Sequence, residues 1–116
     1  MQDFRNLKAW QKAHELALFV YRNTADFPRE ETFGPKHSMR KTAVDISAYI
    51  AEASGKPNDR DTAASMNAAI ALTTRLEYYA IMARDLELIP ETAFSQIGET
   101  TVEVRKMLTG FTRTLA

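Results

Sequence analysis

Hydrophobic residues recur at alternating intervals of three and four along most of the chain, the spacing that places side chains on one face of an α-helix. The clearest run consists of Phe94, Ile97, Thr101, Val104, Leu108, Phe111 and Leu115. Two further runs are Met39, Ala43, Ile46, Ile50 and Ala53, and Ala69, Thr73, Leu76, Ala80 and Ala83. Repeats averaging about 3.5 residues keep one seam against neighbouring helices at shallow crossing angles. The pattern therefore predicts an all-α bundle.

Glycine and proline indicate where these helices begin and end. Their positions predict four helices, at about residues 7–26, 35–54, 59–86 and 90–114. Asn6, and either Asn58 or Asp59, are expected N-caps because their side-chain oxygens accept hydrogen bonds from the first helical turn. Pro35 suits a first helical position, and Gly55 tolerates the left-handed conformation that ends many helices.

The connections between the predicted helices determine their order in space. They are about four to eight residues long, too short to cross the length of a bundle. Consecutive helices are therefore expected to be antiparallel neighbours, in an up-down-up-down four-helix bundle. Residues 1–116 form a single domain of this kind, without an internal repeat, a low-complexity segment or a linker.

The amino-acid composition excludes several classes of function and location. The chain has 15 basic and 15 acidic side chains and no Cys, which excludes disulfides, thiol redox chemistry and cysteine metal sites. No apolar run approaches the roughly 18 residues of a membrane span. Charged residues and Trp10 interrupt the start, where a signal peptide has an apolar stretch, so a cytoplasmic location is expected.

The first and third helices carry more apolar side chains than one core stripe requires. The seam of the first helix is expected to contain Leu7, Trp10, Ala13, Ala17 and Tyr21. The additional apolar residues suggest a second buried surface, such as a homo-oligomer interface. The expected interface residues are Leu16, Phe19, Tyr78, Tyr79 and Met82. The alternative is a wide core stripe with a few exposed aromatic side chains.

Metal ligands do not converge in the sequence. A di-metal site in a four-helix bundle needs Glu-x-x-His on two helices. Gln11 precedes His14 by three residues and Gly34 precedes His37, so both motifs lack the Glu. Zinc needs three or four convergent ligands. Both His residues are therefore expected at the surface, and no metal or cofactor is expected.

One short motif has the residue types of a nucleophilic site. Ser38 and Lys41 match Ser-x-x-Lys, in which a lysine amine activates a serine hydroxyl. The accompanying Ser-Asp-Asn and Lys-Thr-Gly elements are missing, and an all-helical bundle offers no obvious oxyanion hole. Glycine-rich phosphate loops are also absent, because the four glycines are isolated. We therefore expect no catalytic residues and a protein that is not an enzyme.

Two carboxylates lie beside apolar seams. Glu77 follows Leu76, and Glu52 lies between Ile50 and Ala53. A carboxylate in such a place is costly unless it is paired. The expected ion-pairing residues are Glu52, Glu77, Arg40 and Arg105. Acid–base chemistry by the two carboxylates is the alternative.

The basic residues suggest a second possible function, the binding of nucleic acid. The densest group lies at the start of the second helix and around the following loop: Lys36, Arg40, Lys41, Lys56 and Arg60. A ring-shaped oligomer can gather such residues into one basic zone that contacts the phosphates of nucleic acid. An ordinary solvated face is the alternative, because the net charge is zero and the charge is spread evenly.

The segment from Asp3 to His14, with the sequence DFRNLKAWQKAH, resembles the opening of a bacterial four-helix bundle family. This family includes the proteins encoded in intervening sequences of 23S ribosomal RNA genes. The resemblance spans roughly residues 3–115 and continues through Phe27-Pro28, Glu31 to Gly34, Arg40, Ala43-Val44, Ile46, Ile50-Ala51-Glu52, Leu76-Glu77 and Arg105 to Leu108.

The resemblance implies an antiparallel bundle that assembles as a homopentameric ring in bacterial cytoplasm, with no known catalytic residues. A related branch, the accessory protein of diversity-generating retroelements, is similar in fold and binds nucleic acid and a reverse transcriptase. Pro35, Ser47, Tyr49 and Ala53 stand where family members usually have Leu, Pro, Asn and Gly. The first hypothesis is therefore a non-enzymatic oligomeric scaffold or interaction module, and the second is a nucleic-acid-binding accessory protein.

Overall fold

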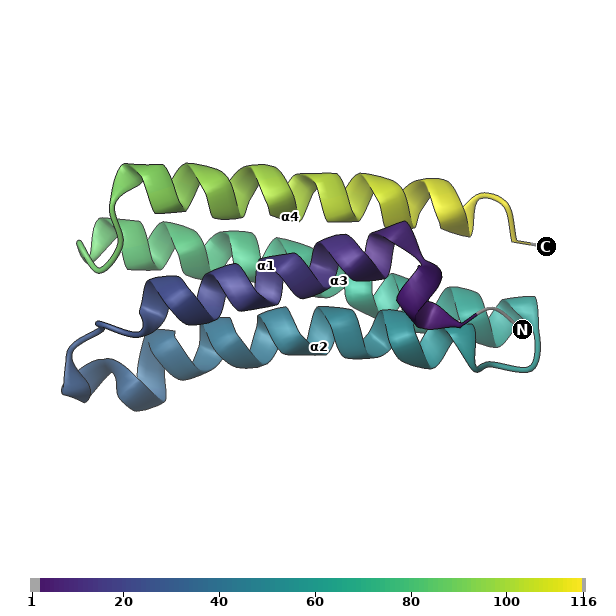
Figure 1. Ribbon diagram of the computed structural model, residues 1–116, viewed down its shortest axis with the longest axis horizontal. Coiled ribbons are helices and arrows are strands. Elements are labelled where there is room, and N and C mark those ends of the chain that lie inside the picture. The colour runs from purple at the N-terminus through teal and green to yellow at the C-terminus, as the bar shows by residue number, and fades with distance from the viewer. Residues whose placement is uncertain (1–2, 116) are drawn as a thin grey trace.

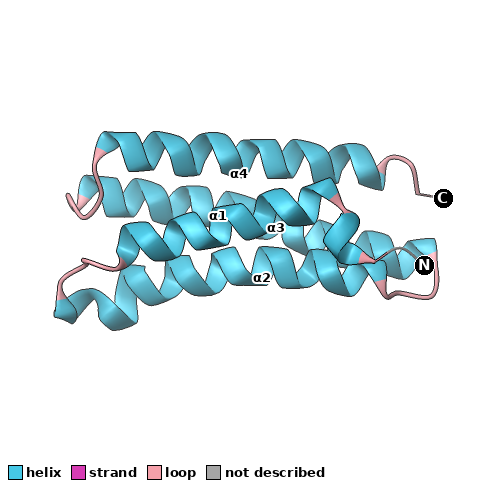
Figure 2. Cartoon of the chain, in the orientation of Figure 1, coloured by secondary structure: helices cyan, strands magenta, loops and turns pink. Residues whose placement is uncertain are grey.

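Four long helices form along the segments whose apolar residues repeat every three or four positions. The computed structural model describes residues 3–115, except for the side chains of residues 32 and 33. The helices are α1 (Lys8–Thr24), α2 (His37–Ser54), α3 (Asp59–Asp85) and α4 (Glu91–Thr112). No strand occurs in the described part of the chain (Figure 2). The all-α prediction is confirmed; residues 1, 2 and 116 of the predicted domain lie outside the described residues.

The helices lie side by side along an axis of 45 Å (Figure 1). In Figure 1, α1 runs from right to left, α2 returns, α3 runs back to the left and α4 returns again, so both termini lie at the right-hand end. α1 packs against α2 and α4, and α3 packs against the same two helices. α1 and α3 are therefore diagonal to one another, and their outward faces point to different sides of the molecule.

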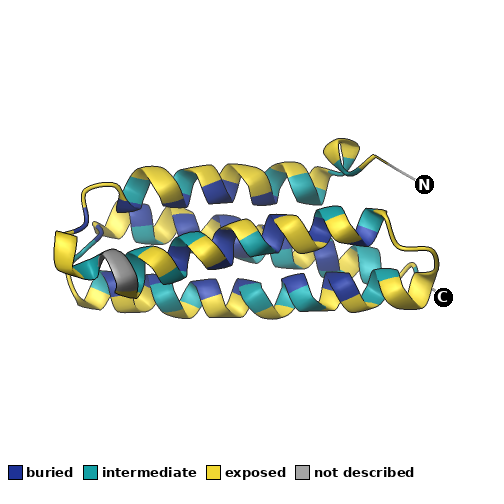
Figure 3. Ribbon diagram, turned by 90° about the horizontal axis from the view of Figure 1, so that it is seen from below, coloured by how far each residue is buried: buried dark blue, intermediate teal, exposed yellow. Residues whose placement is uncertain are grey.

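The core contains the three apolar runs that the spacing predicts. All five residues of the α2 run and all five of the α3 run are buried. In α4, the central residues Ile97, Thr101, Val104 and Leu108 have no exposed surface, whereas Phe94, Phe111 and Leu115 are half-buried. The ribbon is coloured as buried mainly where the helices face one another and as exposed mainly on their outer sides (Figure 3). Periodicity thus located most of the core.

The core stripe of α1 differs from the prediction. Leu16 and Val20 are 1% and 0% exposed and form part of the core, together with Ala13 and Ala17. The expected seam residue Tyr21 is 42% exposed. Because α1 contacts both α2 and α4, a wide stripe of the helix is covered. The assignment of Leu16 to an oligomer interface is therefore wrong.

The first helical turn is capped differently from the prediction. Asn6 lies in a short 3₁₀ helix, η1 (Phe4–Asn6), so it does not cap α1. Leu7 occupies that N-cap position and provides no side-chain hydrogen bond. Asn58 caps α3 as expected, because its Oδ1 accepts a hydrogen bond from the backbone N–H of Asp61 at 2.8 Å.

An irregular segment connects α1 to α2 through η2 (Arg29–Glu31) and η3 (Thr32–Lys36). Gly34, with φ −104° and ψ −117°, interrupts the helical backbone there. Lys36 already has right-handed helical dihedrals, and α2 begins at His37, two residues after the predicted start. The chain therefore enters α2 through a kink at Gly34.

The left-handed helix end occurs at α3 and not at α2. Gly55 has φ −96° and ψ 0°, so the expected left-handed conformation is wrong there. Among the described residues that are not glycine, Glu87 alone has positive φ, at 60°. The backbone N–H of Leu88 donates to Ala83 O at 2.8 Å, and that of Glu87 donates to Arg84 O at 2.9 Å. These two bonds form a Schellman motif, in which glycine is usual at the position of Glu87.

Glu87→Gly is expected to raise the free energy of unfolding by about 0.5–1 kcal/mol. The substitution removes the left-handed strain of a residue with a Cβ, and the greater freedom of glycine in the unfolded chain offsets part of the gain. Thermal unfolding followed by circular dichroism measures the change. Glu91→Gly, in the first turn of α4, is the control and should lower stability. A less stable Glu87→Gly variant would show that the carboxylate of Glu87 makes a stabilising interaction.

Candidate functional site

An apolar groove runs between α1 and α2. It has a volume of about 270 Å³, and we call it the α1–α2 groove; its lining residues are His14, Ala17, Leu18, Tyr21, Val44 and Ser47. Leu18, Tyr21 and Val44 are 40%, 42% and 42% exposed. A folded single chain therefore leaves a row of large apolar side chains in water along these two helices.

A basic depression continues the groove toward the start of α2. It has a volume of about 370 Å³ and is lined by Tyr21, Lys36, His37, Arg40, Lys41, Val44 and Asp45. Tyr21 and Val44 line both hollows, so the apolar and basic surfaces are contiguous. Three of the five predicted nucleic-acid residues, Lys36, Arg40 and Lys41, meet here.

Arg40 has a fixed position between α1 and α2. Its Nε donates to Thr24 Oγ1 at 2.8 Å, and its Nη2 donates to the backbone oxygen of Tyr21 at 2.9 Å. The guanidinium carbon also lies 4.3 Å from the centre of the Tyr21 ring. Arg40 thus satisfies carbonyl and hydroxyl groups at the end of α1, and the prediction that it forms a carboxylate ion pair is wrong.

Lys41 forms an exposed ion pair within α2. Its Nζ lies 2.8 Å from Asp45 Oδ2, and this hydrogen bond raises the pKa of the Lys41 ammonium. A lysine that activates a serine needs a lowered pKa. Ser38 lines a different hollow, beside Tyr78, Tyr79 and Met82 of α3. The structure therefore does not bring Ser38 and Lys41 together as a nucleophile and its base.

The remaining two predicted nucleic-acid residues lie elsewhere. Lys56 follows the end of α2 and Arg60 opens α3, whereas Lys36 precedes α2. An 18-residue helix, about 27 Å long, separates the two groups. Within one chain, the five basic residues therefore form two sites at opposite ends of the bundle.

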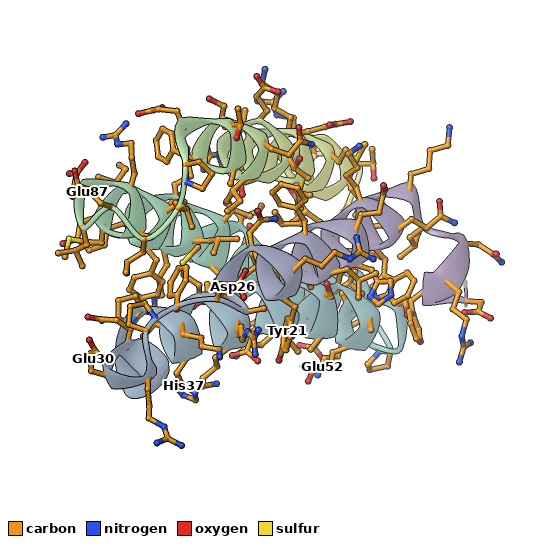
Figure 4. The ribbon with its side chains drawn as sticks, turned by 60° about the vertical axis from the view of Figure 1, so that its left-hand side comes forward. Tyr21, Asp26, Glu30, His37, Glu52 and Glu87 are labelled. Carbon is orange, nitrogen blue, oxygen red and sulfur yellow. The ribbon has the colours of Figure 1, made fainter. Side chains whose placement is uncertain are left out.

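The two predicted seam carboxylates have different environments. Glu77 is half-buried and pairs with Arg105 of α4, whose Nη1 also lies 3.4 Å from Thr73 Oγ1 and Thr74 Oγ1. Glu52 is exposed and points away from the bundle (Figure 4). Among the described residues none forms an ion pair with Glu52, so its predicted pairing is wrong. The side chain lies outside the seam and is exposed to solvent.

The outward face of α3 carries a second apolar surface. Tyr78, Ile81 and Met82, which we call the α3 ridge, are 57%, 39% and 38% exposed. The Tyr79 ring lies 6.2 Å from the Tyr78 ring and is half-buried. Phe19, on α1, is half-buried in the hollow beside Gln96 and Thr100 of α4. Tyr78 and Met82 therefore remain available for an interface, and Phe19 and Tyr79 only in part.

The floor of the α1–α2 groove contains an unsatisfied hydroxyl. Ser47 is 8% exposed, and its Oγ has no hydrogen-bond partner. Buried polar groups are normally hydrogen-bonded to protein or water, so this hydroxyl is free to bond a group that enters the groove. Neither Val44 nor Ser47 was predicted as a binding residue. Their spacing of three on α2, which puts them on one face of the helix, is the signal that could have identified them.

Histidine and carboxylate groups are dispersed over the described residues. The His14 ring stacks on Trp10, with ring centres 5.0 Å apart, and His37 is exposed at the start of α2 (Figure 4). Across residues 3–115, no three His, Asp or Glu side chains are grouped to hold a metal ion. Nor does any described helix have the length and apolar character of a membrane span.

Comparison with known proteins agrees with the all-α fold. The profile of the 23S rRNA-intervening sequence protein family matches residues 5–110. The chain belongs to this family. A crystal structure of a protein of unknown function from the S23 ribosomal protein family of Bacteroides thetaiotaomicron VPI-5482 has 20% sequence identity and a TM-score of 0.84. The similarity covers 91% of this chain and 96% of that one. No curated protein matches the chain.

Proposed function

We propose that the protein is a non-enzymatic, cytosolic scaffold or interaction module that acts as a homo-oligomer, with a ring of five subunits as the expected form. The observation that carries this proposal is the α1–α2 groove, whose apolar side chains stay in water in a single chain. Exposed contiguous apolar surface is typical of protein–protein contacts. The family resemblance is the reason to expect five subunits.

Light scattering of the purified protein tests the assembly. We expect a mass near five times the 13.1 kDa subunit. Val44→Asp should give monomers with unchanged helicity, because assembly would bury a carboxylate without a partner. Val102→Asp makes the same chemical change on α4 and should keep the parental mass. A monomeric parent protein would contradict the proposal.

A second candidate function is nucleic-acid binding, which the basic depression at Lys36, Arg40 and Lys41 favours. In this case the ring would gather one depression from each subunit and bind phosphates without sequence preference. Arg40 also links α1 to α2, so its substitution would confound binding with stability. Lys36 and Lys41 are the better positions to change.

At a protein concentration where both variants keep the parental mass by light scattering, the Lys36→Glu/Lys41→Glu variant is expected to lose nucleic-acid binding. Lys56→Glu/Arg60→Glu, with the same change in net charge, should retain it. Electrophoretic mobility shifts with single- and double-stranded RNA and DNA at low salt measure the difference. For the parent protein, the slope of log K against log salt should be about −0.9 per phosphate contact on duplex DNA. Absence of a complex at tens of micromolar protein would remove this candidate, and equal losses in both variants would point to net charge alone.

A further inference from the structure

We propose that the α1–α2 groove of one chain receives the α3 ridge of a second copy. This inference rests on the proposed oligomeric function and names the two surfaces that meet. The contact is heterologous, since the groove of one copy meets a different surface, the exposed apolar side chains of α3, on the next. Each chain carries both surfaces, so every copy contacts two neighbours.

The side chains of the two surfaces match in chemistry. The groove is lined by Leu18, Tyr21 and Val44, and the ridge exposes Tyr78, Ile81 and Met82. Aromatic and Met side chains are enriched at interface cores, and Tyr combines a large apolar ring with a hydroxyl. A groove facing a second groove would leave a gap between two concave surfaces and would leave the ridge in water.

The unsatisfied Ser47 hydroxyl supports an occupant with polar groups. Its Oγ is buried at the groove floor without a partner. Side chains on a helix lean toward its N-terminus, so Tyr78 leans along α3 toward Thr74 and away from the end that carries Asp85. A ridge seated in the groove therefore brings hydroxyl groups, from Tyr78 and Thr74, that can pair with Ser47.

Charge fixes the relative direction of the two copies. The start of α2 and the end of α3 lie at the same end of the bundle (Figure 1). The start of α2 carries Lys36 and Arg40, whereas the turn after α3 carries Glu87, which is exposed (Figure 4). Two copies that lie side by side in the same direction bring Glu87 of one near Lys36 of the other. Opposite charges then meet at the rim of the contact.

The positions of the two surfaces also affect how successive copies are arranged in the assembly. α2 contacts both α1 and α3, so the groove between α1 and α2 and the ridge on α3 face oblique directions and are not back to back. A heterologous contact repeated with such a bend turns around an axis parallel to the helices. Such a contact gives a ring where its rotation closes and an open helical filament where it does not, so it is compatible with the proposed ring.

Cross-linking between introduced cysteines tests the pairing, because the chain has no Cys of its own. We expect a short bis-maleimide to link the Val44→Cys/Tyr78→Cys protein into a ladder of covalent oligomers on a denaturing gel. The two single variants stay unlinked when separate and form covalent dimers when mixed and allowed to exchange subunits. Val44→Cys/Val102→Cys is the matched control and should give no ladder.

The other outcomes separate this inference from the proposed function. Covalent dimers from Val44→Cys alone would show groove against groove and overturn the inference. An oligomer by light scattering without the ladder would overturn it and leave the proposed function intact, whereas a monomer would overturn both. A second measurement is the dissociation constant of the assembly. Lys36→Glu should raise this constant about tenfold, and adding Glu87→Lys to the same chain should return it to the parental value. Failure to restore it would overturn the proposed direction of the copies.

Discussion

Leu76→Ala is expected to lower the free energy of unfolding by about 3 kcal/mol, the largest effect of any single substitution proposed for this protein. Leu76 has no exposed surface and lies at the centre of the α3 stripe. Its truncation removes apolar contacts and leaves a cavity that helices on either side cannot easily fill, because they are held by their own core residues.

Chemical denaturation at one fixed protein concentration measures this change, since assembly makes apparent stability depend on concentration. Leu86→Ala is the matched control on the same element. Leu86 is 50% exposed, so its truncation should cost less than about 0.5 kcal/mol. Equal losses in the two variants would mean that α3 is packed in a different rotation from the one described.

Arg105→Ala is expected to cost about 1–3 kcal/mol of stability. The substitution leaves the half-buried Glu77 carboxylate without its partner between α3 and α4 and also removes the contacts to Thr73 and Thr74. Leaving a partly desolvated charge unpaired is more costly than losing an exposed ion pair. Lys41→Ala, which breaks the exposed pair with Asp45, should cost less than about 0.5 kcal/mol.

A double-mutant cycle separates the pair from other effects of the substitutions. The coupling free energy between Glu77→Ala and Arg105→Ala should be about 1 kcal/mol, and Glu77→Gln should recover part of the stability lost in Arg105→Ala. A coupling near zero would show that the two side chains contribute independently and that the observed pair is only a surface contact.

The arginine residues illustrate how far sequence reasoning reached within the candidate site. Both Arg40 and Arg105 were expected to pair with carboxylates, and Arg105 does. Arg40 instead donates to Thr24 Oγ1 and to the backbone of Tyr21. The sequence showed that α2 carries an arginine near the end of α1. The groups that accept its hydrogen bonds depend on the rotation of α1 about its axis, which the local apolar spacing does not determine.

The α1–α2 groove illustrates the same limit. Its residues come from segments some 25 positions apart, and each is unremarkable in its own helix: Leu18 and Val44 look like parts of wide core stripes. Only the packing of α1 beside α2 leaves them exposed and contiguous, with Ser47 beneath them. Leu16, two positions from Leu18, is in the core for the same reason.

The sequence by itself determined the helical class, the number of long helices and the core stripes of α2, α3 and α4. These features follow from apolar spacing and from local capping, as at Asn58, and both are properties of a few neighbouring residues. The tertiary structure decided the rotation of α1 and which apolar side chains of α1 and α2 stay exposed in the α1–α2 groove. Those features depend on which helix faces which, because long-range packing, and not local preference, selects the side chains that reach solvent.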